Sequence, residues 1–173
     1  AWPNNSITAT ITITGADAAN YTLIQPIGLK ANISIKPITV SNAVASNKVY
    51  NGTTNAMVTG ATLEGVITGD IVIITSQTGS FATKNVGTGK PVTALVIITG
   101  NDVANYALTQ PTGLTADITS QYLNLVNTVT SNKVYDGTTN TTITGSILTG
   151  VITGDDVTIN SQAANFETRN VGT

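Results

Sequence analysis

Apolar and polar residues alternate along several short stretches of this chain, a period of two that is typical of half-buried β-strands. The clearest stretch is ITATITIT at residues 7–14, where isoleucine or alanine occupies one face and threonine the other. A similar stretch, VTALVIIT at residues 92–99, is apolar on both faces because Leu95 and Ile97 replace two threonines. Either the second face of this strand is covered, or the strand is central in its sheet.

Short strands of this kind are predicted along the whole chain, separated by turns rich in glycine and asparagine. Between residues 36 and 120 they are predicted at 38–44, 48–50, 56–59, 70–75, 80–83, 92–99, 106–109 and 114–118. No segment shows a sustained helical period, although residues 17–21 and 102–106 each fit one short helical turn. Short strands with closely spaced turns predict an all-β, sandwich-like fold of the immunoglobulin-like kind.

The same phrases recur in the same order, so the chain contains a repeat. NKVYNGTTN at residues 47–55 returns as NKVYDGTTN at 132–140. When the two phrases are aligned, more than half of the positions from 36 to 88 match their partners, without a gap. A match of this extent predicts tandem structural units of about 85 residues.

The phase of the repeat defines three parts. Residues 1–35 correspond to the second part of a unit, 36–120 to a complete unit, and 121–173 to the first part of a further unit. Two interpretations are open: the chain is a window on a longer array, or it is a subunit whose strand at 7–14 completes the open unit of another copy. A head-to-tail contact of the second kind builds a filament, while a swapped dimer or two ends folded together are further possibilities. The predicted subunit interface consists of Trp2, Ile7, Ile11 and Ile13.

The repeated phrase around a tyrosine is interpreted as a structural turn. Asn-Gly and Asp-Gly are strong signals for a tight turn, since Asn and Asp tolerate positive φ and accept backbone hydrogen bonds. The tyrosine ring is expected to pack at the edge of the core with its hydroxyl directed at backbone. The turn residues are Tyr50, Asn51 and Gly52 in one copy and Tyr135, Asp136 and Gly137 in the other.

Composition narrows the chemistry available to the chain. Only 9% of the residues are charged, the net charge is −2, and histidine and cysteine are absent. Disulfides, thiolate chemistry and the commonest general base are therefore excluded, and no spacing of acids and nucleophiles suggests an enzyme or a cofactor. The basic residues form no stripe and no apolar run has the length of a membrane span, so neither nucleic acid nor membrane insertion is expected.

Asp155 and Asp156 are weak candidates for a calcium site, because clustered carboxylates supply the oxygen ligands that calcium prefers. The equivalent pair in the other copy is Asp70 and Ile71, so one carboxylate is missing there. Turn chemistry and solvation explain these aspartates more simply, and no metal site is predicted.

Along the repeat unit, with phrases taken from its different copies, the order is KVYDGTT, GVITGDDV, NVGTGK, and then ADAANY followed by QP-x-GL. They resemble the YDG-type repeat of very large bacterial surface exoproteins similar to filamentous haemagglutinin and two-partner-secreted adhesins. The resemblance implies an extracellular, β-rich stalk on a bacterial cell surface, acting in adhesion or biofilm, with further copies or adjacent repeats as partners. The alternative is a carbohydrate-binding module within such a stalk, whose partners would be host or surface glycans bound on coplanar exposed aromatics.

Overall fold

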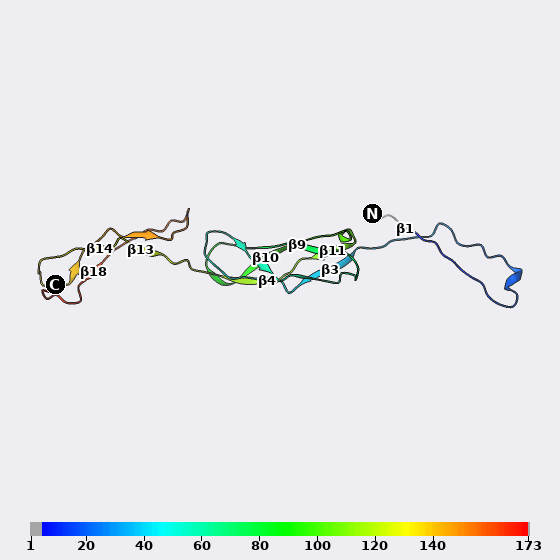
Figure 1. The fold of residues 1–173 in the computed structure, drawn as a ribbon, viewed down its shortest axis with the longest axis horizontal. Coiled ribbons are helices and arrows are strands. Elements are labelled where there is room, and N and C mark those ends of the chain that lie inside the picture. Colours follow the sequence, from blue (N-terminus) through cyan, green and yellow to red (C-terminus); the bar gives the residue numbers. More distant parts are fainter. Residues whose placement is uncertain (1–4, 173) are drawn as a thin grey trace.

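The computed structural model describes residues 5–172, which form an elongated molecule of three parts set end to end (Figure 1). The middle part, residues 36–120, contains most of the sheet structure. The N-terminal part, residues 5–35, extends from one end of it as a long hairpin, and the C-terminal part, residues 121–172, extends from the other end. The molecule is therefore a rod whose parts succeed one another along one axis.

The middle part contains ten strands and one 3-10 turn. They are β3 (Lys36–Ser41), β4 (Val44–Ala45), β5 (Lys48–Val49), β6 (Asn55–Ala56), β7 (Val58–Thr59), β8 (Thr62–Glu64), β9 (Ile73–Phe81), β10 (Gly87–Thr99), η2 (Val103–Asn105), β11 (Tyr106–Thr109) and β12 (Thr115–Thr119). One sheet has the order β5-β12-β10-β9-β6, a second has the order β11-β3-β8, and β4 pairs with β7. The parallel pairs β3–β11 and β5–β12 each join the first half of the unit to its second half.

The buried core of the described chain lies entirely within the middle part. All eleven buried apolar side chains fall between Ile38 and Ile118. One cluster packs residues of β6 and β7 against β9, β10 and β12, and a second joins β3 and β11 near the end of β10. Burying a large aliphatic side chain contributes about 1.5–3 kcal/mol, so these layers hold most of the apolar stabilisation.

The all-β prediction is confirmed. Helical structure within residues 5–172 is limited to two 3-10 turns, η1 (Ala18–Asn20) and η2, both at positions where one short helical turn was predicted. The rest of the regular structure is strand, arranged in several small sheets.

Strand β9 runs without interruption through Gly79, where the sequence predicted separate strands at 70–75 and 80–83. A Cβ atom at this glycine would lie 2.7 Å from Cγ2 of Val58 and 2.9 Å from Cγ1 of Val92. Glycine is therefore needed here for the close approach of two layers, and not for a turn.

The two end parts contain only short antiparallel strand pairs. Their strands are β1 (Asn5–Ser6) and β2 (Lys30–Ala31) in the N-terminal part, and β13 (Asn124–Val126), β14 (Val129–Thr130), β15 (Asn140–Thr141), β16 (Ile143–Thr144), β17 (Ile147–Thr149) and β18 (Ala164–Asn165) in the C-terminal part. The pairs are β1–β2, β13–β17, β14–β16 and β15–β18. Within the described residues, the predicted strand at 7–14 makes no strand pairing. Its counterpart, residues 92–99 of β10, pairs with β9, and residues 5–35 contain no equivalent of β9.

The N-terminal part nevertheless has the local structure of the matching piece of the middle part. The side-chain amide of Gln25 bonds both the backbone N–H and the backbone C=O of Ile11, at 2.8 Å each. Gln110 bonds Val96 in the same way, at 2.8 and 2.9 Å. Gln25 and Gln110 occupy the same position of the repeat, as do Ile11 and Val96, so this bonding recurs with the unit.

Candidate functional site

The loop NKVYNGTTN is organised around one lysine. The ammonium group of Lys48 donates to Oδ1 of Asn51 at 2.9 Å and to the backbone carbonyls of Thr53 and Asn55 at 2.7 and 2.9 Å. Its Nζ also lies 5.6 Å from the centroid of the Phe81 ring. Burial lowers the pKa of this lysine. The lysine closes the loop and so fixes the position of the tyrosine within it.

The second copy has the same arrangement with a carboxylate in place of the amide. Nζ of Lys133 lies 2.8 Å from Oδ1 of Asp136, which also accepts a hydrogen bond from the backbone N–H of Thr138 at 2.9 Å. The lysine, followed by Thr138, lowers the pKa of Asp136 to about 2. Asn51 in one copy can be replaced by Asp136 in the other because this position requires only a side-chain oxygen that accepts hydrogen bonds.

The geometry of the loop differs from a two-residue hairpin turn. Positive φ occurs at Gly52 (+76°) and Gly137 (+77°), and not at Asn51 or Asp136. Strands β5 and β6, which flank Gly52, lie at opposite edges of the five-stranded sheet. The loop therefore crosses the end of the sheet, where its residues face the next part of the rod.

The interunit joint consists of Tyr50, Gly52 and Lys84 of the middle part and Ile152 and Asp155 of the C-terminal part. The Tyr50 hydroxyl donates to Oδ2 of Asp155 at 2.6 Å, and the Lys84 ammonium donates to Oδ1 at 2.7 Å. A Cβ atom on Gly52 would lie 2.9 Å from Cγ2 of Ile152. The tyrosine hydroxyl thus binds a carboxylate of the following part, and not backbone as was predicted from the sequence.

Both hydrogen bonds at the joint favour the ionised form of Asp155. The Lys84 ammonium, and then the Tyr50 hydroxyl, lower the pKa of Asp155, and the same contact raises the pKa of Lys84. The side chains of Lys84 and Asp155 are 45% and 18% exposed, so salt screens this ion pair in part.

Acid is expected to open the joint. The folded pKa of Asp155 lies below its ordinary 3.8, so the contribution of the carboxylate is complete above that value and is lost as pH falls through the lowered one. Carbon NMR of the Asp155 carboxyl should follow this titration. Replacing Lys84 by Met is the control and should return the midpoint toward its ordinary value; an unchanged midpoint in that variant would contradict the assignment.

Asp70, the counterpart of Asp155, makes a related contact inside the middle part. The Tyr106 hydroxyl donates to Oδ2 of Asp70 at 2.5 Å and accepts a hydrogen bond from the backbone N–H of Ile67 at 3.1 Å. The bond to Asp70 raises the pKa of Tyr106. The complete unit therefore fixes its own GVITGD loop with a tyrosine.

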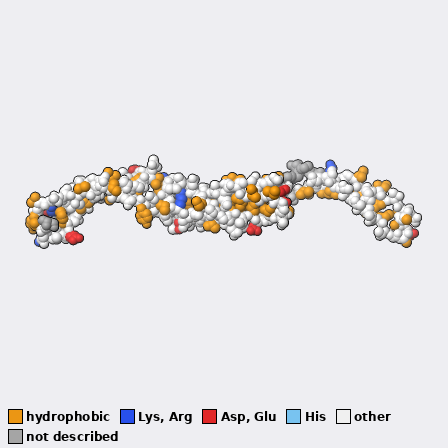
Figure 2. All heavy atoms as spheres, viewed as in Figure 1, with side chains coloured by type: hydrophobic (Ala, Val, Ile, Leu, Met, Phe, Trp, Pro, Cys, Tyr) orange, Lys and Arg blue, Asp and Glu red, His pale blue; other side chains and the backbone are white. Residues whose placement is uncertain are grey.

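The predicted interface isoleucines expose an apolar face on the N-terminal part. Their exposed fractions are 45% for Ile7, 52% for Ile11 and 43% for Ile13. The counterparts of the first two in β10, Val92 and Val96, are only 6% and 2% exposed. Figure 2 shows hydrophobic side chains at the surface of both end parts. Trp2, the remaining predicted interface residue, lies outside the described residues.

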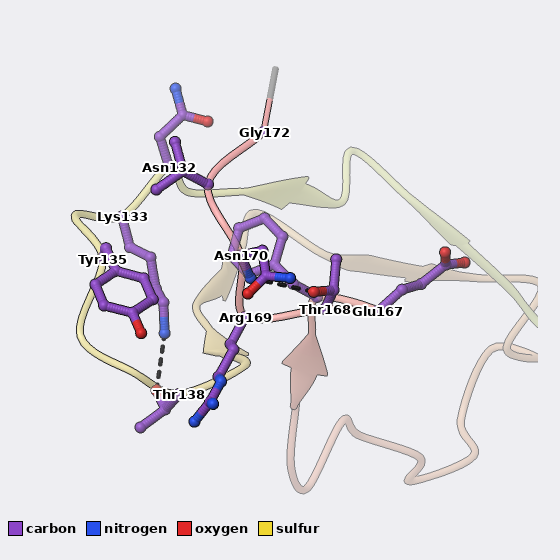
Figure 3. A pocket seen from close by; sticks show the side chains of 11 residues that line it. Asn132, Lys133, Tyr135, Thr138, Glu167, Thr168, Arg169, Asn170 and Gly172 are labelled. Carbon is purple, nitrogen blue, oxygen red and sulfur yellow. Dashed lines mark hydrogen bonds between the residues drawn. The ribbon is translucent and has the colours of Figure 1, made fainter.

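The C-terminal part exposes the other half of a unit core. Phe166 is 44% exposed, whereas its counterpart Phe81 is 3% exposed. An open pocket of about 690 Å³ lies beside Phe166, and its lining includes Lys133, Tyr135 and Arg169. Figure 3 shows the loop that carries Lys133 and Tyr135 facing the segment that carries Arg169.

The two calcium candidates have different surroundings. Asp155 is bound by the Lys84 ammonium, whose positive charge opposes a cation at the same carboxylate. Asp156 is exposed to solvent. Within residues 5–172 no group of three or more His, Cys, Asp or Glu side chains is placed to hold a metal ion.

The sequence did not predict that Lys84 and Asp155 belong to one site with the Tyr50 hydroxyl. A signal for the carboxylate was present, because GVITGD at 65–70 and 150–155 is repeated without a change. An unchanged loop is expected where a second surface must fit it, and the joint supplies that surface.

The fold and the joint define a class of protein: all-β units that follow one another along a rod and meet through side chains repeated with the units. The YDG domain family matches residues 34–113 and 119–173, which together make up more than half of the chain. The chain therefore belongs to the YDG domain family. No curated protein and no solved structure matches it. Among the described residues, no helix has the length and apolarity to cross a membrane.

Proposed function

We propose that this chain is a structural segment of an extended extracellular stalk or filament on a bacterial cell surface, serving adhesion or biofilm formation. The observation that carries the proposal is the end-to-end arrangement of the parts (Figure 1). Tyr50, Lys84 and Asp155 join two of these parts. Side chains at a joint of this kind transmit orientation from one unit to the next, which suits a spacer. The motif resemblance to exoproteins similar to filamentous haemagglutinin and two-partner-secreted adhesins supports the cell-surface location.

The open faces of the end parts support a head-to-tail assembly of this chain. The N-terminal part carries the counterparts of β10 and β12, and the C-terminal part carries the counterparts of β5 and β9. In the middle part these strands pair with one another, β10 with β9 and β12 with β5. By strand addition, the N-terminal part of one copy therefore supplies the counterparts of β10 and β12 that the C-terminal part of another copy lacks.

The pocket in the C-terminal part agrees with this pairing. In the middle part, Ile118 of β12 lies opposite Lys48, and the backbone N–H of Tyr50 donates to the Thr119 carbonyl at 2.8 Å. The counterparts of Lys48 and Tyr50 are Lys133 and Tyr135, which line the open pocket (Figure 3). A strand added beside Lys133 would cover the exposed ring of Phe166 as β10 and β12 cover Phe81.

Light scattering and negative-stain microscopy over a wide range of concentration test the assembly. Linear filaments that lengthen with concentration through end-to-end addition, at constant width, are expected. A chain that stays monomeric at every concentration would overturn the assembly. Antibodies raised against the chain should label intact cells of the source bacterium, and labelling only after lysis would overturn the surface location.

No observation favours the carbohydrate-binding alternative over the stalk. The exposed tyrosines are Tyr21 (72%) in the N-terminal part and Tyr122 (86%) and Tyr135 (59%) in the C-terminal part. Tyr122 lies two residues before β13, whereas Tyr135 lines the open pocket. The counterparts of Tyr21 and Tyr135 in the middle part, which are Tyr106 and Tyr50, bind carboxylates through their hydroxyls. The exposure of Tyr21 and Tyr135 is thus the exposure of incomplete units.

A further inference from the structure

Two surfaces of this chain carry the same motif, but among residues 5–172 only one of them is in contact with a neighbouring part. A Cβ atom on Gly52 would lie 2.9 Å from Cγ2 of Ile152, because that isoleucine packs on the glycine. At Gly137, the counterpart of Gly52, no atom of the described residues lies within 4 Å of such a Cβ atom. Tyr135, the counterpart of Tyr50, is 59% exposed. The C-terminal part therefore presents an open copy of the surface that the interunit joint uses.

The loop that fits this surface is also open, at the opposite end of the middle part. Ile67 and Asp70 occupy the positions of Ile152 and Asp155 in the unchanged sequence GVITGD. Ile67 is 55% exposed. Oδ2 of Asp70 accepts the hydrogen bond of its own Tyr106, and among the described residues no hydrogen bond reaches Oδ1. In the interunit joint the equivalent Oδ1 accepts the lysine ammonium.

We propose that Tyr135, Gly137 and Arg169 form a docking site for the loop Ile67–Asp70 of a second copy of this chain. In this contact the Tyr135 hydroxyl and the Arg169 guanidinium bind the Asp70 carboxylate, and the Ile67 side chain packs on Gly137. The proposal rests on the head-to-tail assembly above and identifies the contact that orients one copy on the next.

The chemistry of the open site matches that of the occupied one. Arg169 stands where the joint has Lys84, so a cation faces the carboxylate in both. A guanidinium offers several N–H donors to a carboxylate, and each carboxylate oxygen accepts more than one hydrogen bond. Asp70 can thus bind its own Tyr106 together with Tyr135 and Arg169 of the other copy.

The order of the chain brings the two surfaces together. The C-terminal part of one copy, completed by the N-terminal part of the next, corresponds to the complete unit at 36–120. The chain then continues at residue 36 of the next copy, as it continues at residue 121 after the complete unit. Asp70 of the next copy therefore has the same position relative to Tyr135 as Asp155 has relative to Tyr50 within one chain.

Zero-length carbodiimide cross-linking of the full chain tests the proposal, because it joins a carboxylate to an amine in direct contact. Arginine does not react, so the variant Arg169→Lys supplies the amine in the docking site. The expected product is a covalent link between position 169 of one copy and Asp70 of another, identified by peptide mass spectrometry. The link between Lys84 and Asp155 within one chain, whose atoms lie 2.7 Å apart, is the positive control in the same sample.

A second variant separates contact from chance collision. Tyr135→Phe added to Arg169→Lys should reduce the yield of the intermolecular link several-fold while leaving the internal link unchanged. Formation of the internal link without the link to Asp70 overturns the docking site. If filaments still form in that case, only the docking site has failed; if scattering also finds monomers, the assembly has failed with it.

Discussion

Replacing Ile11 by Asp is expected to abolish the proposed head-to-tail association while each chain stays folded. The counterpart of Ile11 in the complete unit is Val96, which is 2% exposed inside the layers formed by β9, β10 and β12. A carboxylate at that place would lose its water without gaining a partner, which costs several kcal/mol, so affinity should fall by about 100-fold or more. In the free chain Ile11 is 52% exposed, so the charge costs little there. Analytical ultracentrifugation would measure both association and compactness.

The matched control is Thr12→Asp, which adds the same charge at the next position of the same segment. Its counterpart is Ile97, which is 48% exposed on the outer face of β10. Because neighbouring strand residues point to opposite faces, this variant should associate nearly as the wild type does. Equal loss of association in both variants would mean that net charge, and not the buried face, controls assembly.

The alternation of apolar residues predicted the all-β class and most strand positions of the middle part, because side-chain period and burial are local properties of the sequence. The pairing of those strands was not predictable in the same way. The parallel pairs β3–β11 and β5–β12 bring together residues from the two ends of the unit, as in the pairing of Lys48 with Ile118. No short-range signal specifies which distant strands become neighbours.

Gly79 illustrates why some boundaries were wrong. It lies in the gap left between the strands predicted at 70–75 and 80–83, where glycine among Ser, Thr and Gln is not typical of a strand. In the structure Gly79 lies inside β9, and Val58 of another layer packs closely against it. Glycine has the same sequence signature in both roles, and only the packing of the distant strand distinguishes them.

The sequence singled out some residues of the candidate site, but neither Lys84 and Ile152 nor the contacts between the residues were predicted. The repeat drew attention to Tyr50 and Asp155 separately, the first as part of a turn and the second as a weak calcium ligand. They belong to different units and meet only because the units are set end to end. A repeated motif therefore identifies which residues matter, while the stacking of units determines what each residue binds.

Replacing Gly100 by Ala is expected to unfold the middle part at a much lower temperature. Gly100 follows the end of β10 with φ at +141°, a conformation that L-residues rarely adopt. A Cβ atom there would lie 1.9 Å from the backbone oxygen of Ile71 and 2.7 Å from its carbonyl carbon. Backbone cannot rotate away as a side chain can, so we expect a loss on the order of 3–5 kcal/mol. For a unit of this size that is a fall in melting temperature of about 15 °C or more, measurable by circular dichroism in dilute solution.

Gly15 provides the matched control for this change, because it is the counterpart of Gly100 in the N-terminal part. Its φ is +133°, yet a Cβ atom there would lie more than 4 Å from the other atoms of the part of the chain that the structure describes, its own chain neighbours aside. Gly15→Ala therefore introduces similar backbone strain without the collision, and it lies outside the buried core. The main unfolding transition should stay at the wild-type temperature in Gly15→Ala. If Gly100→Ala also melts at that temperature, the close approach of Ile71 to the end of β10 does not hold the unit together.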